Sequence, residues 1–333
     1  MSAKGTQLEV EPAAPAGRSG AAVAALVRLA PVILFAVVFL SFCALSPAFR
    51  TASNVRNILV QSSSVAIAAT GMTLVLLTGG IDLSVGAIMF LSAAVAGKLV
   101  IGGWVPGLAP VPVWLAVLAI LPLGVLFGAV NATLIAGAGM LPFVVTLGTL
   151  YVGRGVALQI TQTRALNLPP QFLSIGHATV AGIPFPVVLL AFTVVGAHLL
   201  LTQTPFGRQL YALGNSPDAA RKAGLQTRRL TAAVYLISAA CAALGGIVSV
   251  AQLGAVSPTF GWQREFAAVA AAVLGGTSLF GGRGTVLPGA LLGALLVQSV
   301  ETGLNMINAD PYSYPVVVGG IIFLAVLIDR LRG

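Results

Sequence analysis

Long stretches of this chain contain no charged residue at all. No Asp, Glu, Lys or Arg occurs between residues 165 and 207 or between residues 230 and 263. Only 8% of the 333 residues are charged and 58% are hydrophobic, whereas soluble domains carry about a quarter of charged residues. This composition excludes a soluble globular fold. It predicts an all-α polytopic membrane protein, because helices satisfy their own backbone hydrogen bonds within lipid.

Apolar runs of the length needed to cross a bilayer recur along the whole sequence. A spanning helix needs about 20 mostly apolar residues. The runs predict about ten transmembrane helices, of which the eighth is short and could be a broken or half helix. They cover residues 26–46, 58–78, 83–101, 112–135, 142–162, 185–203, 230–251, 265–277, 286–305 and 314–329. Residues 1–25 are expected to form a disordered cytoplasmic tail, and residues 26–330 a single membrane domain.

The basic residues favour one orientation in the membrane. If both ends are cytoplasmic, eleven of the 17 Lys and Arg residues lie inside, and the other six lie outside or within spans. The positive-inside rule therefore predicts cytoplasmic termini, and it places residues 204–229 in the cytoplasm as well. This scattered arrangement explains the net charge of +9 better than nucleic-acid binding does.

Residues 204–229 form a polar island between two apolar spans, and they are predicted to contain a short helix. Ser216 is a suitable N-cap, and Pro217 follows at the first helical position. An acid in the first turn and two basic residues in the last match the helix dipole. Gly224 can adopt the left-handed conformation that ends a helix. A helix over residues 217–223 is too short to be stable alone, so we expect it to dock against another surface.

Two glycine-rich segments share the spacing GGxxLxxG, and each joins two apolar spans at the predicted cytoplasmic end. We call them the first glycine loop, residues 79–86, and the second glycine loop, residues 275–283. Internal repeats are common in transporters, but chance similarity between turns explains the match equally well. We expect close approach of backbones here, and we expect Asp82 to cap the following helix. The residues assigned to the loops are Gly79, Gly80, Asp82, Gly86, Gly275, Gly276, Gly281, Gly282 and Arg283.

No catalytic or metal-binding pattern is recognisable in the sequence. The run GGTSLFGGRGT lacks the Lys of a phosphate-binding loop. His177 and His198 have no neighbouring ligand at metal spacing. Cys43 and Cys241 lie within apolar runs and are expected to be packing residues. We therefore expect neither an enzyme nor a bound cofactor or metal.

A few polar side chains within the apolar spans are candidates for a translocation path. Glu301 is an isolated acid that can share one helix face with Asn305. Arg154 has no evident partner and either pairs with an acid of another span or extends towards the interface. The candidate path residues are Asn131, Thr146, Thr149, Gln159, Gln298, Glu301 and Asn305.

Four long motifs follow one another along the chain. They are GMTLVLLTGGIDLSVGAIMFLSAAVAG at 71–97, LPFVVTLGTLYVGRGVAL at 141–158, TPFGRQLYALGNSPDAARKAGL at 204–225 and AAVLGGTSLFGGRGTVLPGALLGALL at 271–296. In wording and order they resemble the ribose-type sugar permeases of ABC importers, over roughly residues 30–330. Branched-chain amino-acid permeases belong to the same wider family. Pro288 is a small departure from the sugar-branch wording.

The resemblance implies a type II-like ABC importer permease in the bacterial inner membrane, without ATPase activity of its own. Two permease copies, identical or paralogous, would surround a central path. A periplasmic binding protein would deliver a monosaccharide such as ribose, xylose or galactose, and a cytoplasmic ATPase would bind ATP and Mg. The family's coupling segment falls on Asn215, Pro217, Asp218, Ala219, Ala220, Arg221, Lys222 and Gly224.

Other functions remain open at this point. An ABC permease could carry another small polar solute, such as a nucleoside, an autoinducer or a branched-chain amino acid. An ion-coupled secondary transporter would need buried acids or ion sites, for which only Asp82 and Glu301 are available. A membrane-embedded enzyme would need paired acids, a metal cluster or an activated nucleophile, and none is visible.

Overall fold

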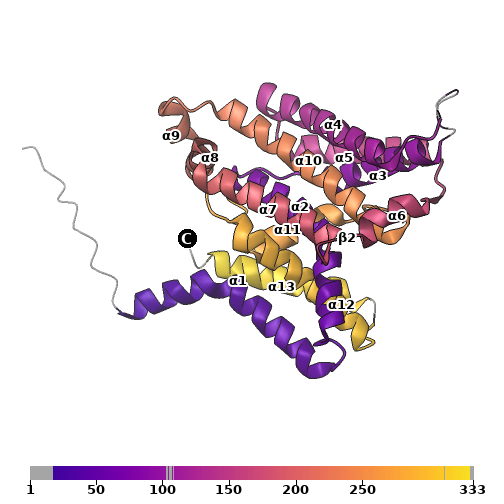
Figure 1. Cartoon of the computed structure of the whole chain (residues 1–333). Helices are drawn as coiled ribbons and strands as arrows, with labels where there is room; N and C mark the ends of the chain where they lie inside the picture. The colour runs from indigo at the N-terminus through magenta and orange to yellow at the C-terminus, as the bar shows by residue number, and fades with distance from the viewer. Residues whose placement is uncertain (1–17, 103, 105–106, 108, 311, 331–333) are drawn as a thin grey trace, which may run out of the picture.

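Helices make up most of the protein in a computed structural model that describes residues 18–102, 104, 107, 109–310 and 312–330 (Figure 1). The α-helices are α1 (Arg18–Leu45), α2 (Ala52–Leu77), α3 (Val85–Ile101), α4 (Val113–Ala132), α5 (Pro142–Thr161), α6 (Pro170–His177), α7 (Phe185–Gln203), α8 (Pro205–Asn215), α9 (Pro217–Lys222), α10 (Thr227–Leu253), α11 (Arg264–Leu274), α12 (Leu291–Met306) and α13 (Ser313–Arg330). Two π-helical segments, η1 (Thr133–Gly137) and η2 (Val286–Ala290), follow α4 and precede α12.

The described residues include two short antiparallel strand pairs. Strand β1 (Leu166–Asn167) pairs with β4 (Ala255–Val256), so that Leu166 faces Val256. Strand β2 (Thr179–Val180) pairs with β3 (Ile183–Pro184) in a hairpin between α6 and α7. The first pair ties the segment after α5 to the segment after α10.

The number of spans differs from the sequence-based expectation. A helix lies at each of the ten predicted positions, but within the described residues only six helices are long and apolar enough to cross a membrane. These six are Ala52–Leu77, Val113–Gly137, Pro142–Thr161, Phe185–Gln203, Thr227–Leu253 and Val286–Met306. Three further apolar stretches are shorter, namely Leu29–Leu45, Val85–Ile101 and Ser313–Leu324. Helix α11, at the eighth predicted span, has only 11 residues. Ten full-length spans are therefore not supported.

The start of the first helix also differs from the expectation. Helix α1 begins at Arg18, so the disordered tail predicted over residues 1–25 overlaps a helix from residue 18 onwards. The rest of that predicted tail, residues 1–17, lies outside the described part of the chain.

Helices α2 and α10 form the centre of the bundle. In their most apolar stretches 83% and 72% of the residues are buried, whereas the corresponding share is 22% for α4, α5 and α7. Small residues allow α4 to approach α10 closely. If a Cβ atom were added to Gly124, it would lie only 2.6 Å from the Cβ of Ala243, and a Cβ added to Gly128 would lie 2.6 Å from the Cβ of Ala239. There is therefore no room for a side chain at either glycine. Close backbone approach of this kind is how helices associate in lipid.

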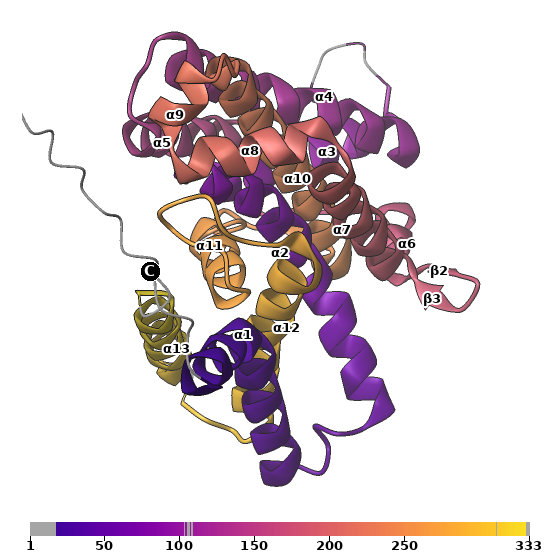
Figure 2. The same ribbon diagram turned by 90° about the vertical axis from the view of Figure 1, so that its left-hand side faces the viewer.

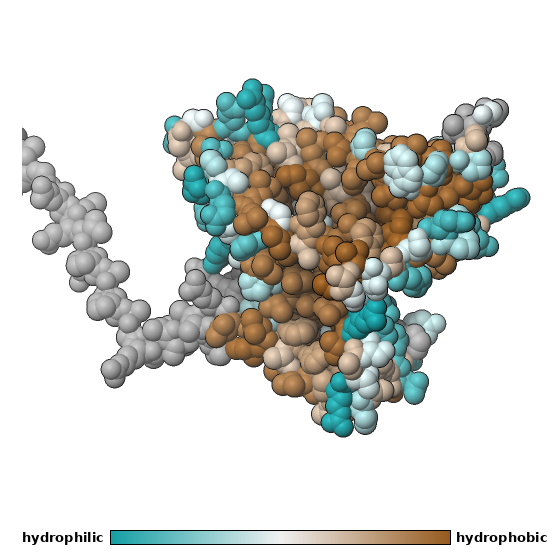
Figure 3. Space-filling model, in the orientation of Figure 1, coloured by the Kyte–Doolittle hydropathy of each residue, from teal (hydrophilic) through white to brown (hydrophobic). Residues whose placement is uncertain are grey.

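The molecule has two polar ends with an apolar belt between them. Helices α8 and α9, the start of α1 and the end of α13 lie together at one end, on the left of Figure 1 and towards the viewer in Figure 2. Helix α6 and the β2–β3 hairpin lie at the opposite end. Figure 3 shows hydrophilic surface at both ends and hydrophobic surface between them. Exposed apolar side chains such as Leu126, Phe192 and Phe323 belong to this belt and suit contact with lipid.

Candidate functional site

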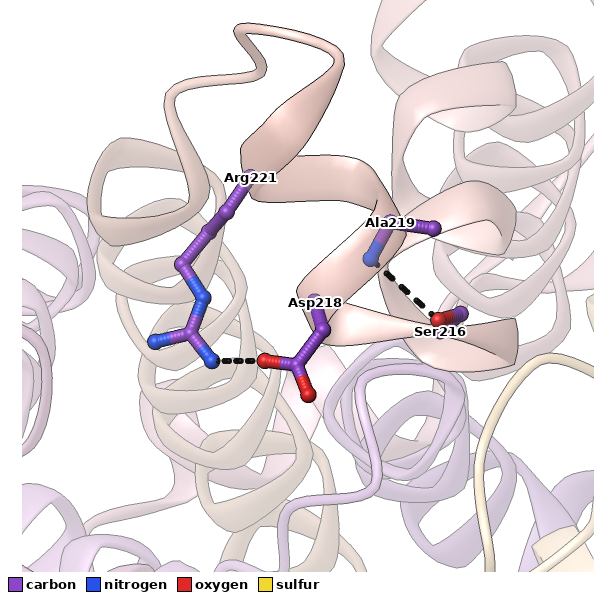
Figure 4. Close-up of polar contacts among 4 residues, drawn as sticks. All are labelled: Ser216, Asp218, Ala219 and Arg221. Atoms are coloured by element: carbon purple, nitrogen blue, oxygen red, sulfur yellow. Dashed lines mark hydrogen bonds and ion pairs between the residues drawn. The ribbon is translucent and has the colours of Figure 1, made fainter.

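Helix α9 is the short helix predicted in the polar island, and it is exposed. The hydroxyl of Ser216 accepts a hydrogen bond of 3.3 Å from the backbone N–H of Ala219, as an N-cap should (Figure 4). One turn in, Asp218 and Arg221 form an ion pair. Both side chains are largely exposed, so this pair adds little to stability. The N-terminal cap therefore does most to define where the helix begins.

The C-terminal end of α9 is closed as expected. Gly224 has a φ of +80°, in the left-handed region. The N–H of Leu225 donates to the carbonyl oxygen of Ala220 at 3.1 Å, and the N–H of Gly224 donates to that of Arg221 at 3.0 Å. This pair of bonds is the Schellman arrangement that ends many helices. The predicted helix is confirmed, and it ends at Lys222 rather than Ala223.

One residue of the coupling segment points inwards. Ala220 is only 4% exposed and packs against Leu213 of α8 and Leu230 of α10. Ala220 belongs to the coupling segment that the resemblance implies, but its side chain packs on its own protein and does not face outwards. The other residues assigned to the coupling segment are exposed, namely Asn215, Pro217, Asp218, Ala219, Arg221, Lys222 and Gly224.

Helix α8 was not expected from the sequence. Thr204 Oγ1 accepts a 3.4 Å hydrogen bond from the N–H of Gly207, and Pro205 occupies the first helical position. The Thr-Pro pair is the same start signal as the Ser-Pro pair of α9, so the sequence did contain a cue. Near the end of α8, the Tyr211 hydroxyl donates to the Gly284 carbonyl oxygen at 2.8 Å. Burial raises the pKa of Tyr211, so the hydroxyl remains a donor.

The two glycine loops meet each other at this end of the protein. The N–H of Gly282 donates a 2.9 Å hydrogen bond to the carbonyl oxygen of Leu77, the last residue of α2. A Cβ atom on Gly281 would lie 2.9 Å from the backbone nitrogen of Gly79. Within the second loop, the N–H of Ser278 donates to the carbonyl oxygen of Arg283 at 2.8 Å. The backbones therefore come as close here as the glycines predicted.

The end of α8 closes the same junction. A Cβ atom on Gly282 would lie 2.7 Å from the Cγ atom of Asn215, and one on Gly281 would lie 3.0 Å from the carbonyl oxygen of Gly214. Asn215 is the last residue of α8, and α9 begins two residues later. The surface helix α9 is thus joined through α8 to both glycine loops.

The other loop glycines make room in different ways. A Cβ atom on Gly275 would overlap the carbonyl group of Gly289, so α11 and η2 touch through their backbones. A Cβ atom on Gly80 would lie 2.7 Å from the hydroxyl oxygen of Tyr235. That hydroxyl donates to the carbonyl oxygen of Ile81 at 3.2 Å, which ties the first glycine loop to α10.

Asp82 is fully buried in the first glycine loop, and its carboxylate is well supplied with donors. Its Oδ1 atom accepts hydrogen bonds from the N–H of Ser84 at 3.0 Å and from the Ser84 hydroxyl at 2.5 Å. Its Oδ2 atom accepts one from the Ser238 hydroxyl of α10 at 2.8 Å. The bond to the Ser84 N–H lies directly before α3, but the N-cap position of that helix is Ser84, without a side-chain capping bond, so Asp82 bonds the residue before the helix and not the helix itself.

The network continues into two further helices. Asn131 of α4 donates to the Ser84 hydroxyl oxygen at 2.9 Å and accepts from the Thr149 hydroxyl of α5 at 2.8 Å. Five polar residues therefore link the first glycine loop to α4, α5 and α10. We call them the Asp82 network: Asp82, Ser84, Asn131, Thr149 and Ser238. A buried network of this kind favours one arrangement of helices, because a broken member leaves a polar group unpaired.

The seven candidate path residues do not form one surface. Asn131 and Thr149 belong to the Asp82 network, and Thr146, one turn before Thr149, is fully buried. Gln298 is buried elsewhere, on α12, where it donates to Gln61 of α2 at 3.0 Å. The remaining three differ in exposure: Glu301 is half-buried, and Gln159 and Asn305 are exposed.

Arg154 has aromatic neighbours. Its guanidinium carbon lies 4.5 Å from the centre of the Trp262 ring and 5.5 Å from that of Phe90. Glu265 is 7% exposed and close enough to interact electrostatically with Arg154. A Cβ atom on Gly86 would overlap the Glu265 carboxylate, which explains the glycine there. Sequence alone could not reveal these partners, since Trp262 and Glu265 lie more than 100 positions away.

Comparison with known proteins adds to this picture. Residues 54–327 match the family described as the permease component of the branched-chain amino acid transport system. The chain belongs to this permease family. The matched residues include both glycine loops, α8, α9 and the Asp82 network.

Among the described residues, no group of three or more His, Cys, Asp or Glu side chains could hold a metal ion.

Individual permeases match nearly the whole chain. The D-allose transport system permease protein AlsC of Escherichia coli (strain K12) is 37% identical over 300 residues, which is 90% of each chain. The ribose import permease protein RbsC of the same organism is 38% identical over 309 residues, 91% of this chain and 92% of its own. The fructose import permease protein FrcC of Rhizobium meliloti is 35% identical over 325 residues, 94% and 86%. No solved structure matches. The resemblance predicted from the four motifs is confirmed.

Proposed function

We propose that this permease is the membrane-spanning subunit of an ATP-driven importer for a monosaccharide. The observation that carries the proposal is that an exposed helix, α9, is capped at both ends and joined through α8 to the two glycine loops. A loop that merely connects two spans needs neither the caps nor the junction. The relatives named for D-allose, ribose and fructose transport supply the solute class.

The partner at α9 is a cytoplasmic ATPase, which binds ATP and Mg and hydrolyses the nucleotide. Ala219 at the exposed side of α9 permits close approach, and Arg221 and Lys222 offer charged donors around it. The path of coupling runs from α9 through Asn215 to Gly282 and the end of α2. From there the Asp82 network reaches α4, α5 and α10.

The orientation follows from the basic residues. The end that carries α8 and α9 is cytoplasmic, and so are both termini. The single membrane domain over residues 26–330 spans the bacterial inner membrane, with α11 as a half helix and α3 as a short span. The opposite end, with α6 and the β2–β3 hairpin, meets a periplasmic sugar-binding protein. A second permease copy completes the translocation path.

A different solute is the second candidate. The family description names branched-chain amino acids, so an amino acid is the alternative cargo. Ion-driven transport is less favoured, because Asp82, one of its two candidate acids, already accepts hydrogen bonds from Ser84 and Ser238 at both carboxylate oxygens, which leaves Glu301 alone. An ion-coupling acid needs a free coordination position.

The proposal is tested by reconstituting the permease in liposomes with the ATPase that co-purifies with it and with its binding protein. Uptake of radiolabelled D-ribose, D-allose or D-fructose should require internal ATP and should be insensitive to ionophores. The permease alone should hydrolyse no ATP. Uptake that continues without ATP and stops with an ionophore would refute the proposal in favour of a secondary transporter.

A further inference from the structure

A cavity whose lining combines apolar residues with a few charged and polar ones lies between α11, α12 and α13, at the end of these helices that is remote from the glycine loops. Its volume is about 330 Å³, near the lower limit of the roughly 300–1,000 Å³ typical of small-molecule sites. Trp262, Arg264, Phe266, Glu301 and Tyr314 line it. None of these residues takes part in the α9 junction or in the Asp82 network.

The charged side chains of this cavity have unused hydrogen-bonding capacity. Within the described residues, neither the side chain of Arg264 nor that of Glu301 forms a hydrogen bond or an ion pair. Both lie close enough to Tyr314 to interact with it electrostatically. A planar guanidinium and a carboxylate can each bond two neighbouring hydroxyl groups of one molecule.

The aromatic side chains offer ring faces beside these groups. Trp262 is 62% exposed and Phe266, one turn later, is 58% exposed. The indole of Trp262 makes a cation–π contact with Arg154, whose guanidinium carbon lies 4.5 Å from the centre of the ring. Arg154 is in turn flanked by Phe90 and attracted by Glu265. The ring is therefore positioned before any ligand arrives, which lowers the cost of binding.

We propose that this cavity binds a single monosaccharide on its way into the translocation path, an inference that rests on the proposed function. One C–H face of a sugar ring would pack on Trp262, while Arg264 and Glu301 bond its hydroxyls. The partial exposure of Trp262 and Phe266 suits a solute that keeps some of its water. An aliphatic amino acid side chain would instead favour an enclosed apolar pocket.

A larger cavity elsewhere does not offer this chemistry. It measures about 940 Å³ and lies among α4, α6, α7 and α10, where its lining is almost wholly apolar. Among the described residues that line it, Gln171 and Ser174 carry polar amide and hydroxyl groups, and none is charged. A sugar placed there would lose its bonds to water without replacement.

Trp262 itself can report binding. The chain has three tryptophans, so the double variant Trp104→Phe, Trp114→Phe leaves Trp262 as the only one. This variant is placed in lipid nanodiscs without ATPase or binding protein. Its fluorescence is then titrated with D-ribose, D-allose, D-fructose and L-leucine. We expect a saturable change with at least one of the sugars and none with L-leucine.

Two substitutions identify the cavity as the site. Glu301→Gln and Arg264→Gln, each made in the same background, should weaken the sugar response about tenfold, the effect of losing one hydrogen bond to a charged group. Asp310→Asn is the matched control, because it removes an exposed carboxylate near the start of α13 that does not line the cavity. It should leave the response unchanged. Circular dichroism and size-exclusion elution check that each variant is folded.

Several results would overturn the assignment. The first is the absence of a saturable fluorescence change with any of the three sugars. The second is a change with L-leucine alone. The third is an equal sugar response in Glu301→Gln and in its parent. A change in oligomeric mass on Glu301→Gln, without a sugar response, would show that the cavity is an interface between copies. Normal ATP-driven uptake without sugar binding in nanodiscs would refute the sugar site in this cavity, but it would leave the proposed importer function intact. Binding without ATP-driven uptake would count against the importer alone.

Discussion

The backbone N–H of Gly282 donates a 2.9 Å hydrogen bond to the carbonyl oxygen of Leu77 and so joins the second glycine loop to the end of α2. Asn215, the last residue of α8, packs directly against Gly282. Since α9 follows α8 after a single residue, a displacement of α9 must either move both loops or break this junction. Under the proposed function, the junction is where binding of the ATPase at α9 would reach the membrane domain.

Gly282→Ala should damage this junction. The φ of Gly282 is +70°, and the added Cβ would lie 2.7 Å from Asn215 Cγ. We expect a loss of about 1–3 kcal/mol in the free energy of unfolding, seen as a lower melting temperature in detergent. Gly148→Ala is the matched control, because no atom lies within 4 Å of its added Cβ and it sits inside α5. Equal melting temperatures for the two variants would contradict close packing at the junction.

Asp82→Asn and Asp82→Leu should behave differently. The Asn amide can accept from Ser84 and donate to Ser238, so the network persists and both folding and uptake should be largely retained. Leu leaves these hydroxyls unpaired in a buried site, at a cost of about 1–3 kcal/mol for each. Expression, melting temperature and uptake of the two variants are compared with those of the parent. Loss of uptake in a stable Asp82→Asn variant would mean that transport uses the charge itself.

Asn131→Ala should loosen the packing of α4 and α5. The substitution removes the bridge between Ser84 and Thr149, and we expect it to lower the free energy of unfolding by about 1–2 kcal/mol. Gln159→Ala on the exposed side of α5 should change stability by less than about 0.5 kcal/mol. Thermal unfolding of the purified variants measures both. An Asn131→Ala variant of parental stability but reduced uptake would show that Asn131 contacts solute instead.

Cysteine labelling checks the orientation. In a background without Cys43 and Cys241, single cysteines replace Ser174 of α6 and Ser216 before α9, both of which are exposed. A membrane-impermeant maleimide should label position 174 in intact spheroplasts and position 216 only after lysis. Labelling of both from the outside would contradict the cytoplasmic placement of α9.

Local signals and long-range contacts differed in how well the sequence predicted them. Ser216, Pro217 and Gly224 define α9 through bonds within a few residues, so its start and end were predictable. A Thr-Pro pair, which is a start signal of the same kind, stands before α8, so the start of that helix was predictable as well. Which side of α9 packs inwards depends on Leu213 and Leu230 of other helices, so the burial of Ala220 could not be predicted.

The Asp82 network shows the same limit more strongly. Ser238 lies 156 positions from Asp82, and Asn131 lies 47 positions from Ser84. No periodicity along one helix brings such residues together, because their proximity follows from how α4, α5 and α10 pack around the first glycine loop. Apolar length, by contrast, predicted where helices lie and that the eighth is short, which the 11 residues of α11 confirm.

The most direct test of the account is co-purification of the ATPase with the Ala219→Trp variant. Ala219 is exposed on α9 and not part of the inward-facing cluster, so the bulky ring should leave the permease folded and inserted. It should nevertheless prevent close contact at the centre of a small interface. Ala178→Trp, at an exposed alanine of the opposite end, is the matched control. The account predicts that Ala219→Trp loses the ATPase and sugar uptake, while Ala178→Trp retains the ATPase. Parental amounts of ATPase bound to Ala219→Trp, with normal uptake, would show that α9 is not the coupling element.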